Sequence, residues 1–349
     1  MKERRKFIGQ SLAALTGTVL LPFGGKGMSG YFEKYKDIIL GHNGFQYKID
    51  LNWGALNHEF YPVNDCHEMV QDSRGRIVLL TNHTQNNVII YDKSGQLLEV
   101  WGTEFPGAHG LTLHVENGED FLYITDYERH EVIKTTIDGK VVLVLPYPAE
   151  TGRYGKADLY KPTETAIAPN GDIFVADGYG QQLILQYNPK GELLHFFGGR
   201  GEGDEHLDNA HGIVIDTRNA GNPTLLVTDR KRNQFKRFGM DGKLLEVFHL
   251  PGAYVCRPVI HGEHIYTATI WSGDGQPETG FVSILDKNNR LVSAPGGIEP
   301  VYENGQLQTM RQAVKVFKHP HDVCVDEDEN LYVAQWNSGK TYPVKLVRV

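Results

Sequence analysis

The stretch from His211 to Gly242 contains the pattern that decides the fold. It reads His211-Gly-Ile-Val-Ile, then Thr-Leu-Leu-Val-Thr-Asp229, then Phe-Lys-Arg-Phe and the turn Asp241-Gly242. The same order returns from His109 to Gly139 and from Thr163 to Gly191. Each copy predicts a strand entered at a polar residue, a second strand that ends in Asp, and a third strand before a turn. Self-similarity of this kind is typical of repeat architectures.

Three looser copies, which begin at His67, Arg257 and His321, bring the number of repeats to six. Their spacing is near the ~40–50 residues of one propeller blade, except for a long excursion around Trp271 in the fifth. The blades resemble NHL repeats. We therefore expect an all-β fold, a six-bladed β-propeller with four antiparallel strands per blade. The stretch Tyr47 to Trp53 is expected to add an outer strand to the last blade and close the ring. A two-sheet sandwich is the alternative, but it explains neither the repeat length nor the returning Asp.

The N-terminal residues resemble a targeting signal. Arg4 and Arg5 precede a mildly apolar run from Leu12 to Phe23. Twin arginines before such a run are typical of a bacterial Tat signal, although a Sec signal or a simple basic terminus stays open. The run is too short and too rich in Gly for an integral membrane span. We expect residues 1–28 to be a Tat-like signal, residues 29–349 to form the propeller, and the protein to be exported to the periplasm or beyond.

Composition restricts the partners and the redox chemistry. The net charge is −8, with 35 basic and 43 acidic residues, and this balance argues against a nucleic-acid partner. The three cysteines are Cys66, Cys256 and Cys324. An odd number without a C-x-x-C pair argues against a disulfide framework or a thiolate metal site. We expect three buried free thiols.

In a propeller, the first strand of each blade lines the central channel. The six starts should therefore converge, and four of them are the histidines His67, His109, His211 and His321. Converging neutral imidazoles suit zinc or a similar divalent ion. The alternative is that these imidazoles form separate hydrogen bonds to neighbouring backbone. Such bonds explain one or two of the histidines more easily than four.

The loops between second and third strands open at the same mouth and supply further candidates. Tyr179 is the candidate acid–base residue, because a cation nearby would stabilise its phenolate. Arg230 could bind a substrate carboxylate. An ordinary rim position is the alternative for both. His67, His83 and Arg257 are candidate substrate-binding residues, and His67 could instead complete the metal coordination. The aspartates that end second strands are expected to cap turns.

Several of these segments resemble the lyase domain of peptidylglycine α-amidating enzymes. They are His109-Gly-Leu-Thr-Leu, Pro162-Thr163-Glu164, Ala-Asp177-Gly178-Tyr179, Ala210-His211-Gly-Ile, Thr-Asp229-Arg230 and Pro320-His321-Asp322-Val. The resemblance implies a zinc ion held by His109, His211 and His321, with Tyr179 taking the proton of the substrate hydroxyl and Arg230 contacting substrate. It also implies a structural calcium ion in the channel, with Asp322 and the carbonyl of Leu111 as ligands.

The resemblance has departures. The first blade reads Thr81-Asn82-His83-Thr84 where the family has another arginine, and no cysteines match the family's disulfides. The leading hypothesis is an exported, metal-dependent lyase or hydrolase that acts on a small-molecule, peptide or carbohydrate-derived substrate. The alternative is a non-catalytic NHL propeller that binds protein or glycan. A lactone-hydrolysing propeller is a third possibility, but that class usually surrounds calcium with carboxylates and Asn. Oligomeric state is left open by the sequence.

Overall fold

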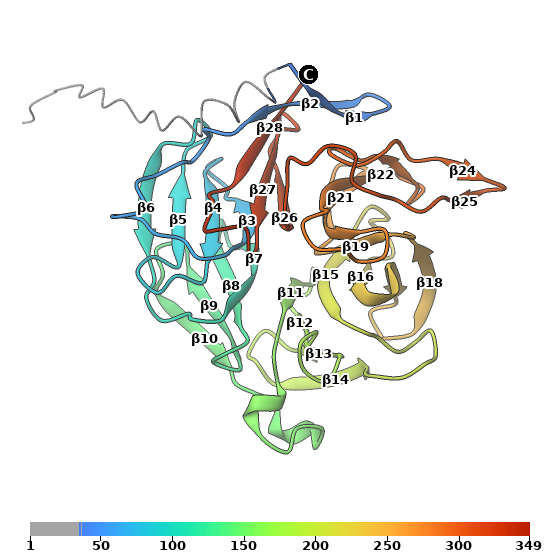
Figure 1. The fold of residues 1–349 in the computed structure, drawn as a ribbon. Coiled ribbons are helices and arrows are strands. Elements are labelled where there is room, and N and C mark those ends of the chain that lie inside the picture. The colour runs from blue at the N-terminus through green and yellow to red at the C-terminus, as the bar shows by residue number, and fades with distance from the viewer. Residues whose placement is uncertain (1–34, 36) are drawn as a thin grey trace, which may run out of the picture. The chain divides into compact units, whose positions relative to one another are not determined.

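The computed structural model describes Tyr35 and residues 37–349. Residues 37–349 form six blade sheets around a central channel and one additional two-stranded hairpin (Figure 1). The innermost strands follow one another in chain order around the ring, and the sixth blade closes against the first. The expected six-bladed, all-β propeller is confirmed. The expected signal at 1–28 lies outside the described residues, and no helix among the described ones is long and apolar enough to cross a membrane.

The first three blades each contain four antiparallel strands in sequence order. Blade one is β3 (Cys66–Gln71), β4 (Ile77–Thr81), β5 (Val88–Tyr91) and β6 (Leu97–Trp101). Blade two is β7 (Ala108–Glu116), β8 (Glu119–Asp126), β9 (Glu131–Thr136) and β10 (Val141–Leu145). Blade three is β11 (Glu164–Ile167), β12 (Ile173–Ala176), β13 (Leu183–Tyr187) and β14 (Leu193–Gly198). Two short 3₁₀ turns, η1 (Ala149–Thr151) and η2 (Ala157–Leu159), lie between blades two and three.

Blade four repeats this pattern, whereas blade five has a broken inner strand. Blade four is β15 (Ala210–Asp216), β16 (Thr224–Asp229), β17 (Gln234–Phe238) and β18 (Leu244–His249), with the 3₁₀ turn η3 (Arg230–Arg232) after β16. In blade five, β19 (Ala253–Val255) and β20 (Val259–His261) both pair with β21 (His264–Ser272), followed by β22 (Phe281–Leu285) and β23 (Leu291–Ser293). A small hairpin, β24 (Tyr302–Glu303) and β25 (Gln306–Leu307), follows.

The sixth blade joins both ends of the described chain. Its inner strands are β26 (Pro320–Val325), β27 (Leu331–Gln335) and β28 (Val344–Arg348). β2 (Phe45–Asp50) pairs with β28, and β1 (Ile39–His42) pairs with β2 outside it. The expected closing strand is therefore present, although it begins two residues earlier than Tyr47 and ends before Trp53. The bend after Asp50 explains the earlier end, because the Asp50 carboxylate accepts hydrogen bonds from the Asn52 and Trp53 backbone N–H groups.

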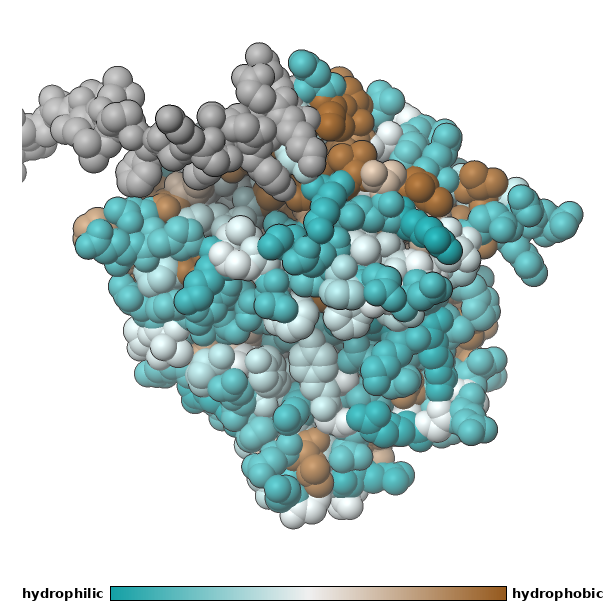
Figure 2. Space-filling model, in the orientation of Figure 1, coloured by the Kyte–Doolittle hydropathy of each residue, from teal (hydrophilic) through white to brown (hydrophobic). Residues whose placement is uncertain are grey.

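Apolar side chains fill the spaces between neighbouring blades. Between blades six and one, for example, Met69 and Ile77 pack in one cluster with Tyr332 and Ala334. The aspartates at the ends of second strands bind backbone, as expected: Asp126 accepts hydrogen bonds from three N–H groups around its loop. The three cysteines are buried and free. Hydrophilic side chains cover most of the face seen in Figure 2, with smaller hydrophobic groups among them.

Candidate metal centre and active site

A β-bulge places each of the four channel histidines. The pairing between first and second strands slips by one residue at His67, His109, His211 and His321. A bulge bends the strand locally and redirects the side chain of the extra residue. The imidazoles therefore leave the regular in-and-out alternation of their strands and meet at the channel axis.

The four imidazoles form one buried group. The ring centroids of neighbouring pairs lie 4.7–4.9 Å apart. Each of the four residues is at most 2% exposed. Burial lowers the pKa of all four imidazoles, that of His67 to about 4. The rings are neutral at physiological pH and their nitrogens are available as metal ligands.

Hydrogen bonds determine which ring nitrogens remain free. The Nδ1 atom of His109 lies 2.8 Å from the Thr163 carbonyl oxygen, and the Nδ1 atom of His321 lies 3.0 Å from the His67 carbonyl oxygen. These bonds direct the Nε2 atom of each ring into the channel, which is how proteins commonly orient metal-binding imidazoles. Both nitrogens of His67 and the Nδ1 atom of His211 are buried without a hydrogen-bond partner.

Among the described residues, one group has metal-ligating atoms close enough to share an ion. It consists of His67, His109 and His321, whose ligand atoms lie within 4.8 Å of one another. This set differs from the expected one by the exchange of His67 for His211. His211 still belongs to the same cluster of rings, but its Nε2 atom lies 3.2 Å from the Tyr179 hydroxyl.

Tyr179 lies where acid–base chemistry would need it. It follows β12, and its hydroxyl is 3.0 Å from His109 Nε2 as well as in contact with His211. The residue is 37% exposed, so the ring reaches the solvent while the hydroxyl points at the imidazoles. Burial raises the pKa of this phenol, and the Arg230 guanidinium counteracts that shift.

Arg230 lies beside Tyr179 at the wall of an open cavity. Its side chain is held from blade five, by a contact of Nη2 with Cys256 Sγ at 3.1 Å and of Nε with the Val255 carbonyl at 3.4 Å. The cavity has a volume of about 420 Å³ and reaches His321. It therefore connects solvent with the histidine group, and its lining includes Tyr179, Arg200, Arg230, Lys231, Trp271 and Trp336.

Two expected substrate-binding residues, His83 and Arg257, do not line the open cavity. His83 stays in its own loop, where its Nδ1 atom accepts a hydrogen bond from the Gln85 N–H group. Arg257 is buried in the channel and donates to Asp322 and to the carbonyl oxygen of Leu111. The position expected for a calcium ion is thus taken by a guanidinium, because the two expected calcium ligands already accept its hydrogen bonds.

Glu68 was not predicted from the sequence, whereas Glu164, at the position after the start of the third repeat, was expected to hydrogen-bond a metal-binding imidazole. Glu68 accepts a hydrogen bond from the Leu111 N–H group, and Glu164 bonds Thr112 and Thr165 rather than an imidazole. The sequence contains a pattern that could have indicated these buried acids, because an acidic residue directly follows three of the six blade starts. The cavity residue Arg200 was also missed, and no repeat position marks it.

Comparison with known proteins supports the expected resemblance. No protein-family model matches the chain. It is 40% identical to peptidyl-α-hydroxyglycine α-amidating lyase 1 of Drosophila melanogaster over 332 residues, which cover 88% of this chain and 54% of that protein. It is 23% identical to peptidylglycine α-amidating monooxygenase of Rattus norvegicus over 282 residues, 75% of this chain and 25% of the relative. The chain thus spans about half the length of the first relative and a quarter of the second.

A solved structure supports the fold alone. A gluconolactonase from Xanthomonas campestris superposes with a TM-score of 0.59 at 13% identity, covering 90% of this chain and 96% of that one. Together with the blade topology, these similarities show that the chain is a six-bladed β-propeller homologous to the peptidyl-α-hydroxyglycine α-amidating lyases.

Proposed function

We propose that this protein is a metal-dependent lyase that cleaves a carbinolamide, with a peptidyl-α-hydroxyglycine as the model substrate. One observation carries the proposal: the Tyr179 hydroxyl lies between two of four buried, neutral imidazoles that face one another in the channel. The similar Drosophila protein is a peptidyl-α-hydroxyglycine α-amidating lyase, and this suggests the reaction class.

The histidine group fits a divalent transition metal such as zinc. Buried ring nitrogens without hydrogen-bond partners are costly, and a metal ion would remove that cost. His109 and His321 belong both to the set implied by the resemblance and to the set with the closest ligand atoms. The third ligand is His211 or His67. When bound, the ion would polarise the oxygen of the substrate.

The protein's own residues would move the proton and hold the substrate. Burial raises the pKa of Tyr179, but a cation held by the neighbouring imidazoles would stabilise its phenolate, which would then accept the proton of the carbinol hydroxyl. The C=O bond then forms as the C–N bond breaks, and the proton passes from Tyr179 to the departing amide nitrogen. The products are an amide and glyoxylate. Arg230, at the wall of the open cavity, binds the carboxylate of the glycine-derived part.

The test measures metal content and lyase turnover together. Wild-type protein reconstituted with zinc should hold about one equivalent and release glyoxylate from an α-hydroxyglycine peptide. His109→Ala and His321→Ala should lose both properties, whereas the loop variant His83→Ala should keep the metal. Comparison of His67→Ala with His211→Ala identifies the third ligand. Wild type with less than about a tenth of an equivalent would contradict the proposal and favour a non-catalytic binding propeller.

We also propose that the protein acts outside the cytoplasm, on the basis of Arg4 and Arg5. Replacing both by Lys should leave precursor in the cytoplasm, as measured by cell fractionation. Normal export of that variant would contradict a Tat route.

A further inference from the structure

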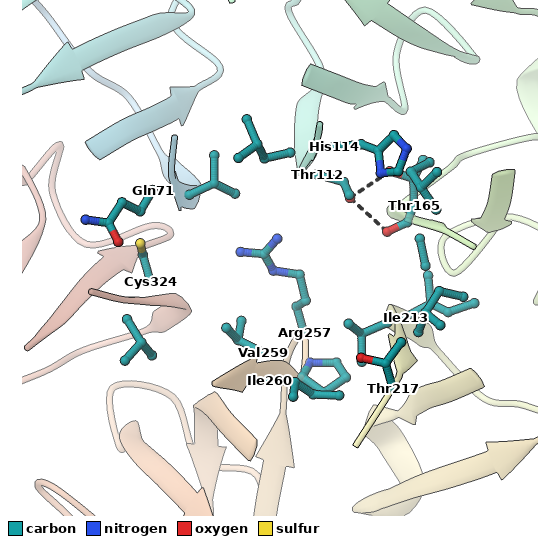
Figure 3. Close-up of a pocket in the computed structure, with 18 of the residues that line it drawn as sticks. Gln71, Thr112, His114, Thr165, Ile213, Thr217, Arg257, Val259, Ile260 and Cys324 are labelled. Carbon is teal, nitrogen blue, oxygen red and sulfur yellow. Dashed lines mark hydrogen bonds between the residues drawn. The ribbon is translucent and has the colours of Figure 1, made fainter. Parts of the chain in front are cut away.

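The break in the inner strand of blade five sends one arginine into the middle of the channel. β19 ends at Val255 and β20 begins at Val259, and Arg257 lies between them, directly before Pro258. Proline has no N–H group to give to a sheet, and it restricts the residue before it to extended conformations. Arg257 therefore leaves the sheet edge. Figure 3 shows its guanidinium reaching toward the centre of the channel, surrounded by side chains of other blades.

The guanidinium binds three other blades at once. Its Nε and Nη2 atoms donate to the two carboxylate oxygens of Asp322 in blade six, at 3.0 and 2.7 Å. Nη1 donates to the Leu111 carbonyl of blade two at 2.8 Å, and Nη2 to the Met69 carbonyl of blade one at 3.0 Å. The planar fork of arginine matches a carboxylate in this two-point way, which makes the contact both strong and directional.

The surroundings of Arg257 require a cation. The carboxylate oxygens of Glu68 and Glu164 lie 3.5 and 3.7 Å from its nitrogens, in addition to those of Asp322. All three acids are fully buried. Buried carboxylates are costly unless a positive charge and hydrogen bonds compensate them. Arg257 supplies both from within the chain.

The same oxygen atoms are those that calcium would need. Calcium binds carboxylate and carbonyl oxygens at about 2.3–2.6 Å, and the set of Asp322, Leu111 and Met69 offers only such atoms. Every one of these groups already accepts a hydrogen bond from Arg257. An ion at that point would overlap the guanidinium, so the site does not fit calcium while Arg257 is present.

We propose that Arg257 is the resident cation of the channel and replaces the structural calcium ion, so that the propeller needs no calcium to be stable. The residue then acts as a positioning residue. Asp322 directly follows His321, and Met69 lies two residues after His67, so the guanidinium also fixes the strands that carry two of the channel histidines.

The experiment uses the full chain, stripped of metal and reloaded with zinc alone. Thermal midpoints are measured with and without added CaCl₂, and bound calcium is quantified by emission spectrometry. Wild type should bind less than about a tenth of an equivalent of calcium and show no shift. Arg257→Ala should melt roughly 5–10 °C lower without calcium, bind about one equivalent, and recover part of the loss when calcium is added.

Two further variants complete the test. Arg257→Lys keeps the charge and should fold without calcium even if Arg257→Ala does not. Arg76→Ala removes an arginine that also pairs with an aspartate, Asp72, and should gain no calcium site. Calcium binding with stabilisation in wild type would overturn the proposal. So would an Arg257→Ala protein that melts as wild type does without calcium and gains no calcium affinity, or an Arg257→Lys protein that does not fold without calcium.

Discussion

Replacing Tyr179 by Phe removes one oxygen atom and leaves the ring in place. The hydroxyl has two partners, His109 Nε2 at 3.0 Å and His211 Nε2 at 3.2 Å. A hydrogen bond contributes about 0.5–1.5 kcal/mol net, so the free energy of unfolding should fall by at most about 3 kcal/mol. A positioned acid–base group accelerates a reaction about 10²–10⁴-fold, which corresponds to roughly 3–5 kcal/mol of barrier. The main effect should therefore be on kcat.

The assay follows glyoxylate release from an α-hydroxyglycine peptide and the metal content of the same samples. Tyr179→Phe should keep its metal and its KM while kcat falls by the factor above. Tyr127→Phe is the matched control, because its ring lies 5.8 Å from that of Tyr179 and 6.2 Å from that of His109. We expect kcat of the control within about threefold of wild type. Retained turnover in Tyr179→Phe with metal bound would refute the role of the hydroxyl.

Two further predictions concern stability. Burial raises the pKa of Asp216, but hydrogen bonds from two arginines outweigh burial and lower this pKa to about 2. The carboxylate therefore stabilises the fold by up to about 2 kcal/mol at pH values above its unfolded pKa near 4. This stabilisation is lost as the pH falls toward 2. Asp216→Asn should therefore be less stable than wild type in denaturant titrations at pH 7, with a gap that closes at low pH; a gap independent of pH would contradict the assignment. A Cβ atom at Gly110 would lie 2.5 Å from the Thr163 carbonyl oxygen, so Gly110→Ala should lose about 1–3 kcal/mol and weaken zinc retention, whereas Gly155→Ala, with open space around it, should do neither. Equal midpoints and metal contents for the two glycine variants would show that blades two and three do not pack this tightly.

The sequence was sufficient to predict the six blades, because polar strand entries and second strands ending in Asp repeat along the chain. It also predicted that the channel histidines and Tyr179 lie at one mouth of the central channel, since the position in the repeat determines the end of the blade at which a residue lies. The position of a residue in the repeat does not determine the direction in which its side chain points. His67 was expected either to touch the substrate or to complete the coordination, and the repeat alone could not separate the two. In the structure its nitrogens have no hydrogen-bond partner and belong to the closest group of metal-ligating atoms.

Arg257 was the largest departure from the sequence-based expectation. Its blade position suggested the mouth of the channel, but the strand break before Pro258 turns it inward toward Asp322. Such a break depends on which backbone groups find partners across the sheet, and this is a property of the assembled blade rather than of a short motif.

The closure of the ring also sets an order of events in folding. The pairing of β2 with β28 joins residues separated by about three hundred positions, as in the contact of Arg348 with the Gln46 carbonyl. Contacts so distant in sequence carry a large loop-closure entropy and form late. His321 belongs to the blade that this pairing completes. The candidate metal centre is therefore complete only after ring closure. A nascent chain that still lacks the sixth blade would carry three of the channel histidines without His321, so metal binding would indicate that the ring had closed.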